Sequence, residues 1–304
     1  EDFMNARRRL VFEELLLLQI GLFSIKASLS ENKEGIVYSE VDDEMKSFIE
    51  SLPFKLTNAQ KKVLEEINND MENSRIMNRL IQGDVGSGKT IVAALALFKA
   101  VKNGYQGAFM VPTEILAEQH YRSLDNLFSD WGVNVSLLTG SLTRKQKEEV
   151  QNSIKEGKTS IVIGTHALIE DSVEFKNLGL VVTDEQHRFG VRQRSALSQK
   201  GLNPDVLVMT ATPIPRTLAL ILYGDLDISI IDELPPGRKP VKTYVVKEDM
   251  RRRINNFIRG KVAEGRQVYI VCPLVEESDS IEAKSAVGLA EKIAKVDFVD
   301  LKVG

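Results

Sequence analysis

Apolar runs alternate with amphipathic stretches through the middle of the chain. The runs that are apolar almost throughout are 77–81, 107–111, 134–138, 160–163, 178–182 and 206–209. Between them lie stretches with the apolar spacing of helices, including 90–102 and 114–128. Strands that are apolar on both sides and joined by helices are typical of a parallel sheet covered on both faces. The pattern therefore predicts an α/β domain over residues 51–234.

The flanking segments follow other patterns. Residues 1–50 predict a helical arm, in which we expect Gly21 to interrupt the first helix and a second helix to cover 43–51. Residues 235–241 are rich in proline and basic residues, which is typical of a linker. After this linker the pattern predicts a strand at 242–246, a basic helix at 249–264, a strand at 267–272 and a helix at 284–295. Residues 242–304 are few for a whole α/β domain, so we expect a second domain that is incomplete.

Composition narrows the choice of protein class. The chain has 304 residues, of which 43% are hydrophobic and 27% charged, as in ordinary globular proteins. A net charge of −3 means that contacts with nucleic acid must come from local basic patches. One cysteine excludes an intrachain disulfide, and three scattered histidines give no sign of a structural metal. These features favour a reducing, cytoplasmic setting, and the apolar run Leu15–Leu18 is too short to span a bilayer.

The most specific chemical motif is a phosphate-binding loop. It matches G-x-x-x-x-G-K-[ST] in full, as Gly83-Asp84-Val85-Gly86-Ser87-Gly88-Lys89-Thr90. A predicted strand precedes this loop and a predicted helix follows it. The glycines allow backbone N–H groups to close around phosphates, and the helix N-terminus adds about half a positive charge. We expect Lys89 to reach the β- and γ-phosphates of ATP and the Thr90 hydroxyl to help hold Mg²⁺.

An acidic pair follows the predicted strand at 178–182. A carboxylate at the end of a buried parallel strand lies where ligands bind in open α/β sheets. We therefore expect Asp184 to serve the Mg²⁺ ion and Glu185 to act as the base that orients the attacking water. With Lys89, these two residues form the predicted catalytic set.

The ordered series of motifs resembles helicases of superfamily 2. Asp184-Glu185-Gln186-His187 is similar to motif II, and Thr210-Ala211-Thr212 to motif III. Upstream pieces resemble motifs Ia, Ib and Ic, at 112–114, 139–141 and 164–166. Phe54 and Gln60 fall in a stretch that resembles the Q motif, where Gln60 is implied to recognise the adenine edge of ATP. Each piece is weak alone, but their order and spacing are highly specific.

Longer stretches narrow the resemblance to RecG-type helicases. Residues 184–194 and 210–217 are shared with the transcription–repair coupling translocase, whereas 218–240 and 7–15 look like the RecG type. The resemblance implies a first RecA-like ATP-binding domain, an incomplete second RecA-like domain, and an arm that joins to a missing wedge domain. It also implies an ATP-dependent DNA helicase that remodels replication forks and branched junctions in recombination and repair, near the bacterial nucleoid.

The sequence departs from the family pattern in two ways. Thr183 stands before Asp184, where an aliphatic residue is more usual. No Q-x-x-G-R-x-G-R pattern, which carries the arginines of the final motif, occurs in the 304 residues. Because removal of an arginine finger can cost about 10³-fold or more in rate, we expect this chain alone to bind nucleotide with little activity.

Threonines after the predicted strands are candidates for DNA contacts. Thr113, Thr139 and Thr165 can offer hydroxyl groups to phosphate oxygens, which position a strand without recognising its sequence. DNA binding should then be nearly sequence-independent and sensitive to salt. A helix N-cap is an equally good interpretation of each threonine alone. Residues expected to link nucleotide state to DNA are Arg188, Thr210, Thr212 and Arg216.

Other classes of protein remain as alternatives at this point. The chain could belong to a P-loop ATPase of another class, such as a transporter subunit or a nucleotide kinase, although the ordered motifs argue against it. It could also be a transcription–repair translocase, which the stretches at 7–15 and 218–240 disfavour. Basic clusters such as Arg251-Arg252-Arg253 are usually solvated helix faces.

Overall fold

The computed structural model describes residues 2–31, 34–184, 196–212, 226–234, 241–272 and 286–303. The chain divides into two compact units, Glu1–Arg238 and Lys239–Gly304. The strands of the first unit are β1 (Asn78–Gly83), β2 (Gln106–Met110), β3 (Val135–Leu138), β4 (Ile161–Gly164), β5 (Leu178–Thr183), β6 (Asp205–Thr210) and β7 (Asp227–Ile231). Its described helices are α1 (Asp2–Glu31), α2 (Asp42–Ser51), α3 (Asn58–Met71), α4 (Lys89–Lys102), α5 (Glu114–Phe128), α6 (Arg144–Glu156) and the 3-10 turn η1 (His166–Ile169).

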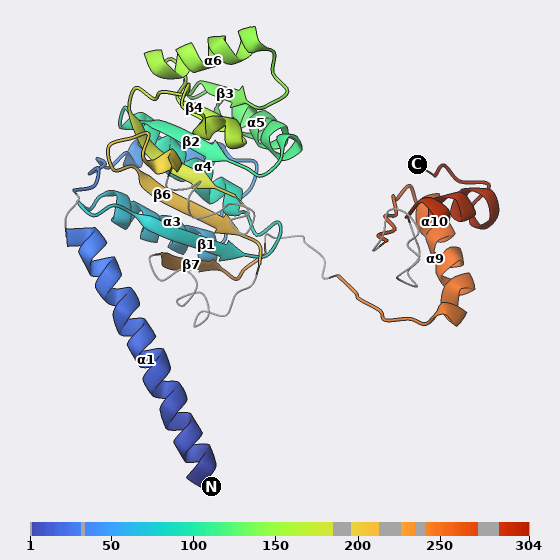
Figure 1. The fold of residues 1–304 in the computed structure, drawn as a ribbon. Coiled ribbons are helices and arrows are strands. Elements are labelled where there is room, and N and C mark those ends of the chain that lie inside the picture. The colour runs from blue at the N-terminus through green and yellow to red at the C-terminus, as the bar shows by residue number, and fades with distance from the viewer. Residues whose placement is uncertain are drawn as a thin grey trace. The chain divides into compact units, whose positions relative to one another are not determined.

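The seven strands form one sheet in the order β3-β4-β2-β5-β6-β1-β7, and every pairing is parallel. Figure 1 shows this order from β3 at the top to β7 at the bottom. The six predicted runs are confirmed as β1 to β6, and the predicted helices at 90–102 and 114–128 as α4 and α5. The edge strand β7 was not predicted. The α/β fold class is therefore confirmed, with one strand more than expected.

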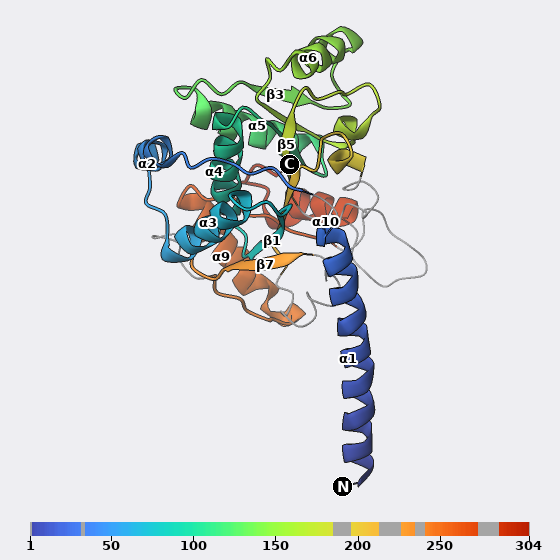
Figure 2. The ribbon, with the colours of Figure 1, turned by 90° about the vertical axis from the view of Figure 1, so that its left-hand side faces the viewer.

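Helices cover both faces of the sheet. One core joins α2, α3, α4 and α5 to one face, and fully buried residues of α4 such as Leu95 and Phe98 lie at its centre. Figure 2 shows α2, α3 and α4 on this side of the sheet. A second core forms on the opposite face, where Ile154 of α6 and Leu168 of η1 pack against Val181 of β5. Burial on both faces explains why inner strands such as β5 are apolar at nearly every position.

An aromatic cluster attaches α2 to the domain. Phe48 of α2 stacks on Phe98 of α4 with ring centroids 4.5 Å apart, and on Phe128 at the end of α5 at 5.5 Å. Trp131 meets Phe48 edge-on at 5.1 Å. Each such pair contributes about 0.5–1.5 kcal/mol beyond the area that it buries. Part of the predicted helical arm is thus a component of the ATPase-like core.

Polar side chains connect the strands at the edge of the sheet where the strands begin. Asp205, the first residue of β6, is fully buried, and its Oδ1 accepts a hydrogen bond of 2.7 Å from the backbone N–H of Met77. Burial raises the pKa of this carboxyl well above its ordinary value. The buried Tyr38 hydroxyl donates to the carbonyl of Gly179 in β5 at 2.7 Å, and burial also raises the pKa of Tyr38. Both groups hold this edge together through hydrogen bonds to the backbone.

The edge strand β7 is fastened to α3 and β1 by one arginine. Arg79 of β1 contacts Asp70 at 2.7 Å and Glu66 at 3.2 Å, both on α3. Arg79 also donates to the Ser229 hydroxyl of β7 at 2.8 Å. Because the Arg79 side chain is only 11% exposed, these contacts are stronger than a surface ion pair and fix the position of the last strand.

The first helix differs from the expectation in one respect. Gly21 does not interrupt α1, which continues from Asp2 to Glu31. Glycine within a helix costs only about 1 kcal/mol, and no neighbouring group crowds this position. The apolar residues of α1 from Phe3 to Ile20 are exposed. Among the described residues, no helix combines the length and the hydropathy needed to cross a bilayer.

The second unit contains helices without a described sheet. These are the short turn η3 (Glu248–Met250), α9 (Arg251–Ala263), α10 (Ala286–Lys292) and the π-helical turn η4 (Ile293–Asp297). Arg251 binds Asp297 at 2.8 Å and Arg259 binds Asp300, so α9 packs against the segment that ends the unit. The helices predicted at 249–264 and 284–295 are confirmed in outline.

The strands predicted at 242–246 and 267–272 are wrong for this structure, which shows no strand in either segment. Their apolar residues are exposed instead, for example Val245 at 99% and Val271 at 92%. A β-strand needs a neighbouring strand to satisfy its backbone, and no described residue of this unit supplies one. The predicted linker at 235–241 lies outside the described residues except for Val241.

Candidate functional site

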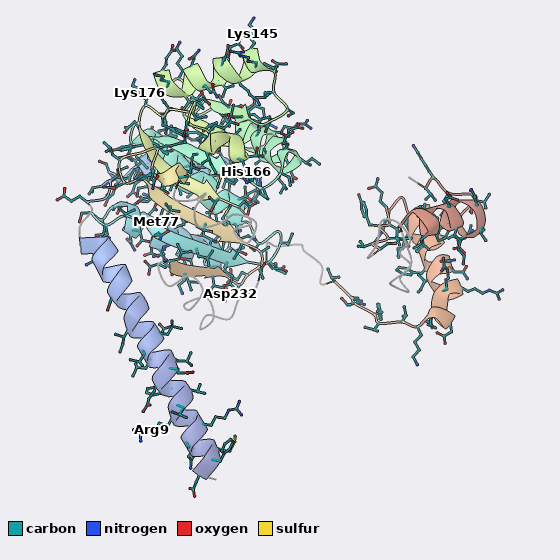
Figure 3. All side chains as sticks on the ribbon, in the orientation of Figure 1. Arg9, Met77, Lys145, His166, Lys176 and Asp232 are labelled. Carbon is teal, nitrogen blue, oxygen red and sulfur yellow. The ribbon has the colours of Figure 1, made fainter. Side chains whose placement is uncertain are left out.

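Apart from Phe54 and Gln60, which precede the first strand in the chain, the predicted site residues that the structure describes lie at one edge of the sheet or on the loops that leave it. Because the strands are parallel, their carboxyl ends share this edge. Figure 3 labels both edges: Met77 and Lys176 come just before β1 and β5, whereas His166 and Asp232 come just after β4 and β7, on the opposite side. Loops from strands far apart in sequence therefore meet along a single rim.

The phosphate-binding loop connects β1 to α4. Gly86 and Gly88 have φ angles of 74° and 87°, a left-handed conformation that favours glycine. Gly83 is closely surrounded, because a Cβ atom there would lie 2.6 Å from the Ser87 hydroxyl and 3.0 Å from the Ile231 carbonyl oxygen. The loop thus follows a path that only these glycines allow, and it delivers Lys89 to the first position of α4.

Two side chains of the loop fit a phosphate group. The Lys89 ammonium donates to the carbonyl oxygens of Gly83 at 2.8 Å and Asp84 at 3.0 Å, so it is held over the loop. The Ser87 hydroxyl is fully buried and has no hydrogen-bond partner within the described part of the chain. Thr90 follows in the first turn of α4, where backbone N–H groups have no intrahelical acceptor. An anion with several oxygens satisfies all of these donors.

Gln60 connects the upstream motif to this loop. It is buried at 2% exposure, and its Nε2 donates to the Ser87 carbonyl oxygen at 2.8 Å. Its Oε1 accepts from the backbone N–H of Thr57 at 2.9 Å, and the Thr57 hydroxyl accepts from the N–H of Gln60, which completes a capping box at the start of α3. Phe54 lies upstream with its side chain exposed. Of the two predicted adenine-side residues, Gln60 is therefore next to the phosphate loop.

A second contact to α3 comes from the end of the sheet. The Glu233 carboxylate, two residues beyond β7, accepts a hydrogen bond of 3.1 Å from the backbone N–H of Ala59 in the first turn of α3. An acidic side chain at a helix N-terminus is favourable for the helix dipole. Sequence reasoning missed Glu233, since its partner is distant in the chain and no local pattern marks the pair.

Asp184 follows β5, at the centre of the sheet. Its backbone N–H donates to the Met110 carbonyl at 3.0 Å, and its Oδ2 lies 3.3 Å from Nε2 of His120 on α5. Only β6 separates β5 from β1, so Asp184 and the phosphate loop are about 10 Å apart across the sheet. Thr183 is fully buried before it. Glu185 lies outside the described residues.

The oxygen donors at this edge are of the kind that suits a magnesium ion. The Thr90 hydroxyl and the Asp184 carboxylate are hard oxygen donors, which Mg²⁺ prefers, and they stand on the same edge of the sheet. Mg²⁺ in nucleotide sites usually takes one or two protein oxygens and completes its shell with phosphates and water. The residues present are of the kind that such a shell needs.

The threonine-bearing loops occupy the other half of the edge. Thr113 caps α5 by accepting from the Leu116 N–H at 3.3 Å, so the N-cap interpretation holds for this residue. The Thr139 hydroxyl lies 3.0 Å from that of Ser141. Thr165 is buried to 8% exposure just before η1, and its side chain makes no cap bond there.

Glu114, which lies in the motif Ia stretch but was not predicted as a site residue, joins two of these loops. Its carboxylate accepts from the backbone N–H of Ser141 at 3.0 Å. The loop after β2 and the loop after β3 are therefore connected. We define the polar rim as 113–114 and 139–141 together with 165, which follows β4, the strand between β2 and β3. Sequence spacing places these residues at one edge but cannot show which of them touch.

The predicted coupling residues lie partly outside the described residues. Thr210 ends β6 and is buried, and its hydroxyl accepts from the Thr212 N–H at 3.2 Å in a local turn. Arg188 and Arg216 fall in 185–195 and 213–225, which the structure does not describe. Thr210 stands between the phosphate loop and Asp184, since β6 is the strand between β1 and β5.

A glycine-rich loop between strand and helix, with a lysine at its end and a carboxylate two strands away, defines a P-loop nucleotide-binding domain. The DEAD/DEAH box helicase family matches residues 57–221, which is more than half of the chain. The chain belongs to the DEAD/DEAH box helicase family.

Individual proteins with similar sequences point to a narrower group within this family. The ATP-dependent DNA helicase RecG of Bacillus subtilis (strain 168) is 54% identical over 296 residues, which are 97% of this chain and 43% of that protein. RecG of Thermotoga maritima is 51% identical over 301 residues, or 99% of this chain and 38% of that protein. A solved structure of RecG bound to a three-way DNA junction is 47% identical, with a TM-score of 0.82, over 96% of this chain and 38% of that one.

These similarities confirm the resemblance to RecG-type helicases and the RecA-like fold class that the motifs implied. The chain spans about two fifths of the length of the relatives, 43% and 38% in the two cases above. The family match also sets aside the alternative of an unrelated P-loop ATPase, such as a nucleotide kinase.

Proposed function

We propose that the protein carrying this chain is an ATP-dependent DNA helicase that remodels replication forks and branched junctions in recombination and repair. The observation that supports this most is the division of one sheet edge into a nucleotide half and a polar rim, with Asp184 between them. The similar RecG structure is bound to a three-way DNA junction, which supports branched DNA as the partner. We place this activity in the cytoplasm, in association with the nucleoid.

The nucleotide half binds and hydrolyses ATP in this proposal. Lys89 exchanges its loop carbonyls for β- and γ-phosphate oxygens, and backbone N–H groups of Gly83, Gly86, Ser87 and Gly88 surround the phosphates. Thr90 and Asp184 hold Mg²⁺, which supplies positive charge against the phosphates. Glu185 orients the attacking water, while Phe54 and Gln60 hold the adenine side.

The polar rim contacts DNA through phosphate oxygens. Thr165 and the loops that begin at Thr113 and Thr139 offer hydroxyl and backbone N–H donors, which position a strand without recognising its sequence. Binding therefore depends on salt more than on base sequence. Residues assigned to coupling between nucleotide and DNA are Arg188, Thr210, Thr212 and Arg216.

The 304-residue chain alone is proposed to bind nucleotide and hydrolyse it slowly. The arginine-bearing pattern Q-x-x-G-R-x-G-R does not occur within these residues. Arginines that stabilise charge in the transition state contribute about 10³-fold or more to phosphoryl transfer. The same proposal divides the protein into two RecA-like domains joined by a linker at 235–241. The first domain covers 51–234, the second begins at 242, and residues 1–50 form the arm.

The test compares Lys89→Ala with Lys102→Ala in the full-length protein. Both lysines belong to α4, but Lys102 is at its far end and pairs with Glu44 at 3.0 Å. We expect Lys89→Ala to weaken ATP binding by about 10- to 100-fold, because it loses charged hydrogen bonds of about 1.5–3 kcal/mol each. Lys102→Ala should bind ATP as the parent protein does.

The rate of ATP hydrolysis by the unchanged protein, compared between different DNA structures, then identifies the DNA partner. We expect a three-way junction to stimulate ATP hydrolysis more than linear duplex, and scrambling the junction sequence to have little effect. Stimulation by RNA polymerase and not by junctions would instead favour the transcription–repair alternative. Equal ATP binding by the two lysine variants would contradict the nucleotide site itself.

A further inference from the structure

His120 on α5 contacts Asp184, the carboxylate that is proposed to bind Mg²⁺. Nε2 of His120 lies 3.3 Å from Oδ2 of Asp184, and the two side chains are 12% and 15% exposed. The imidazole also lies against the Phe109 ring of β2, with centroids 4.9 Å apart. The contact is therefore enclosed between helix and sheet, where water screens it little.

His120 occupies a position that ordinarily suits an apolar residue. On α5 the buried positions Ala117, Leu124 and Phe128 form the stripe that packs on the sheet, and His120 lies in the turn between the first two. A polar side chain on such a stripe needs a partner, or it loses hydration without compensation. Its partner here is the side chain of Asp184, in the acidic motif, and not a backbone carbonyl.

We propose that His120 is a positioning residue for magnesium: its Nε2–H holds one oxygen of Asp184 and thereby turns the other oxygen toward the ion. This inference rests on the proposed nucleotide site. Carboxylates that ligate metals are commonly fixed by a hydrogen bond of this kind, and loss of that bond typically costs about 10- to 100-fold in metal affinity or activity. A neutral imidazole with its proton on Nε2 is a sufficient donor.

The helix that carries His120 also carries part of the polar rim. Thr113 caps α5, and Glu114 in its first turn accepts from Ser141 of the neighbouring loop. His120 lies two turns further along the same helix, so one rigid element bears both the rim contact and the group that holds Asp184. A shift of α5 along its axis would therefore alter both places together.

The test uses replacements that differ in the position of their donor. In His120→Gln the side-chain amide N–H reaches about as far as Nε2, whereas in His120→Asn it stops short, at the place of Nδ1. His120→Leu keeps the packing and has no donor. Gln119→Leu, at the exposed neighbouring position, controls for added apolar surface.

Binding of ADP to the full-length protein is measured in EDTA and over a series of MgCl₂ concentrations, together with the KM for ATP. We expect His120→Asn and His120→Leu to raise the half-saturating Mg²⁺ concentration about 10-fold and to leave binding in EDTA unchanged. His120→Gln and Gln119→Leu should follow the parent protein. Thermal unfolding shows which variants are folded. If His120→Leu does not fold, the comparison of His120→Asn with His120→Gln still decides the test.

The outcomes separate this inference from the function on which it rests. Equal Mg²⁺ requirements for the parent, the Asn variant and the Gln variant would overturn the role of His120 while the nucleotide site stands. Weakened binding in EDTA as well as in Mg²⁺ would assign His120 to packing and overturn it too. Failure of the unchanged protein to bind nucleotide through Lys89 would instead contradict the proposed function.

Discussion

The side-chain amide of Gln60 hydrogen-bonds to the Ser87 carbonyl oxygen, with 2.8 Å between Nε2 and O. Its other atom, Oε1, serves the N-cap of α3 by accepting from Thr57. One side chain thus connects the helix that bears the Q-like motif to the loop that is expected to hold phosphates. Each end of the amide makes one of these bonds, and Nε2 retains a second N–H for the proposed contact with adenine.

Gln60→Glu separates the two roles of this amide. A glutamate keeps the acceptor for the Thr57 N–H, and glutamate is favourable at this position of a capping box. It loses the donor to Ser87, which leaves a buried carbonyl facing a carboxylate at a cost of about 1–3 kcal/mol. We expect ATP binding to weaken about 10-fold, measured by titration calorimetry.

Gln146→Glu is the matched control for this change. Gln146 completes an equivalent capping box with Thr143 at the start of α6, but it is exposed, and within the described residues its hydrogen bonds at this cap are with Thr143. We expect this variant to bind ATP as the parent protein does. A similar loss in both variants would show that helix capping, and not the contact with Ser87, governs the effect.

Gly88→Ala should damage the phosphate loop more than a comparable change elsewhere. Gly88 has a φ of 87°, and an added Cβ would lie 2.2 Å from the Gln60 Nε2. Gly104 has a φ of 83° but no atom within 4 Å of an added Cβ. A left-handed residue with a side chain costs about 1–2 kcal/mol, so Gly104→Ala should lose that much stability and Gly88→Ala about 3 kcal/mol.

Urea unfolding and ATP binding measure the two glycine variants together. Gly88→Ala should also lose ATP binding, because Gln60 and the loop cannot both keep their places. Adding Gln60→Ala to Gly88→Ala should recover part of the stability by removing the clash. Equal destabilisation by the two single changes would be evidence against a tightly packed loop.

Asp205→Asn should change how stability depends on pH. The pKa of Asp205 is raised well above 3.8 by burial, so the folded protein binds this proton more tightly than the unfolded chain does. Below about pH 3.8 the proton is bound in both states and stability is unaffected. As the pH rises from there toward the raised value, only the unfolded chain releases its proton, and stability falls.

Asparagine keeps the acceptor for the Met77 N–H and has no proton to lose. We therefore expect Asp205→Asn to be more stable than the parent protein near pH 8, with a difference that shrinks toward pH 4, in urea unfolding at several pH values. Asp125→Asn, at an exposed position of α5, should show no such trend. A constant difference at every pH would mean that Asp205 is ionised in the folded protein.

The fold of the first unit could be predicted because burial on both faces leaves a clear trace in the sequence. Runs such as 178–182 are apolar at every position, and amphipathic stretches separate them. The strand β7 escaped prediction because it is at an edge and alternates, with Ile228, Ser229 and Ile230 differing in exposure. The sequence itself alternates as Asp-Ile-Ser-Ile, which could have indicated a strand, but Ser229 is buried and Ile230 is exposed, so this pattern would have placed the wrong face inward.

The site could be predicted only where the chemistry is local. The residues from Gly83 to Thr90 are contiguous, so one motif indicates their arrangement, although no comparison tests their individual roles. Contacts such as His120 with Asp184 join residues 64 positions apart in sequence through the packing of a helix on a sheet. No spacing rule shows such a pair, and the same is true of Glu233 with Ala59.

The hydrogen bond from Ala59 to Glu233 has a mechanical consequence. The chain leaves the sheet at Ile231, and within two residues it is tied to the first turn of α3, where Gln60 grips the phosphate loop. Tension on the polypeptide beyond Glu233 is therefore shared between a strand that flanks β1 and a helix that touches Ser87. A force applied to the chain beyond Glu233 would therefore reach α3 and the proposed phosphate-binding loop through only a few hydrogen bonds.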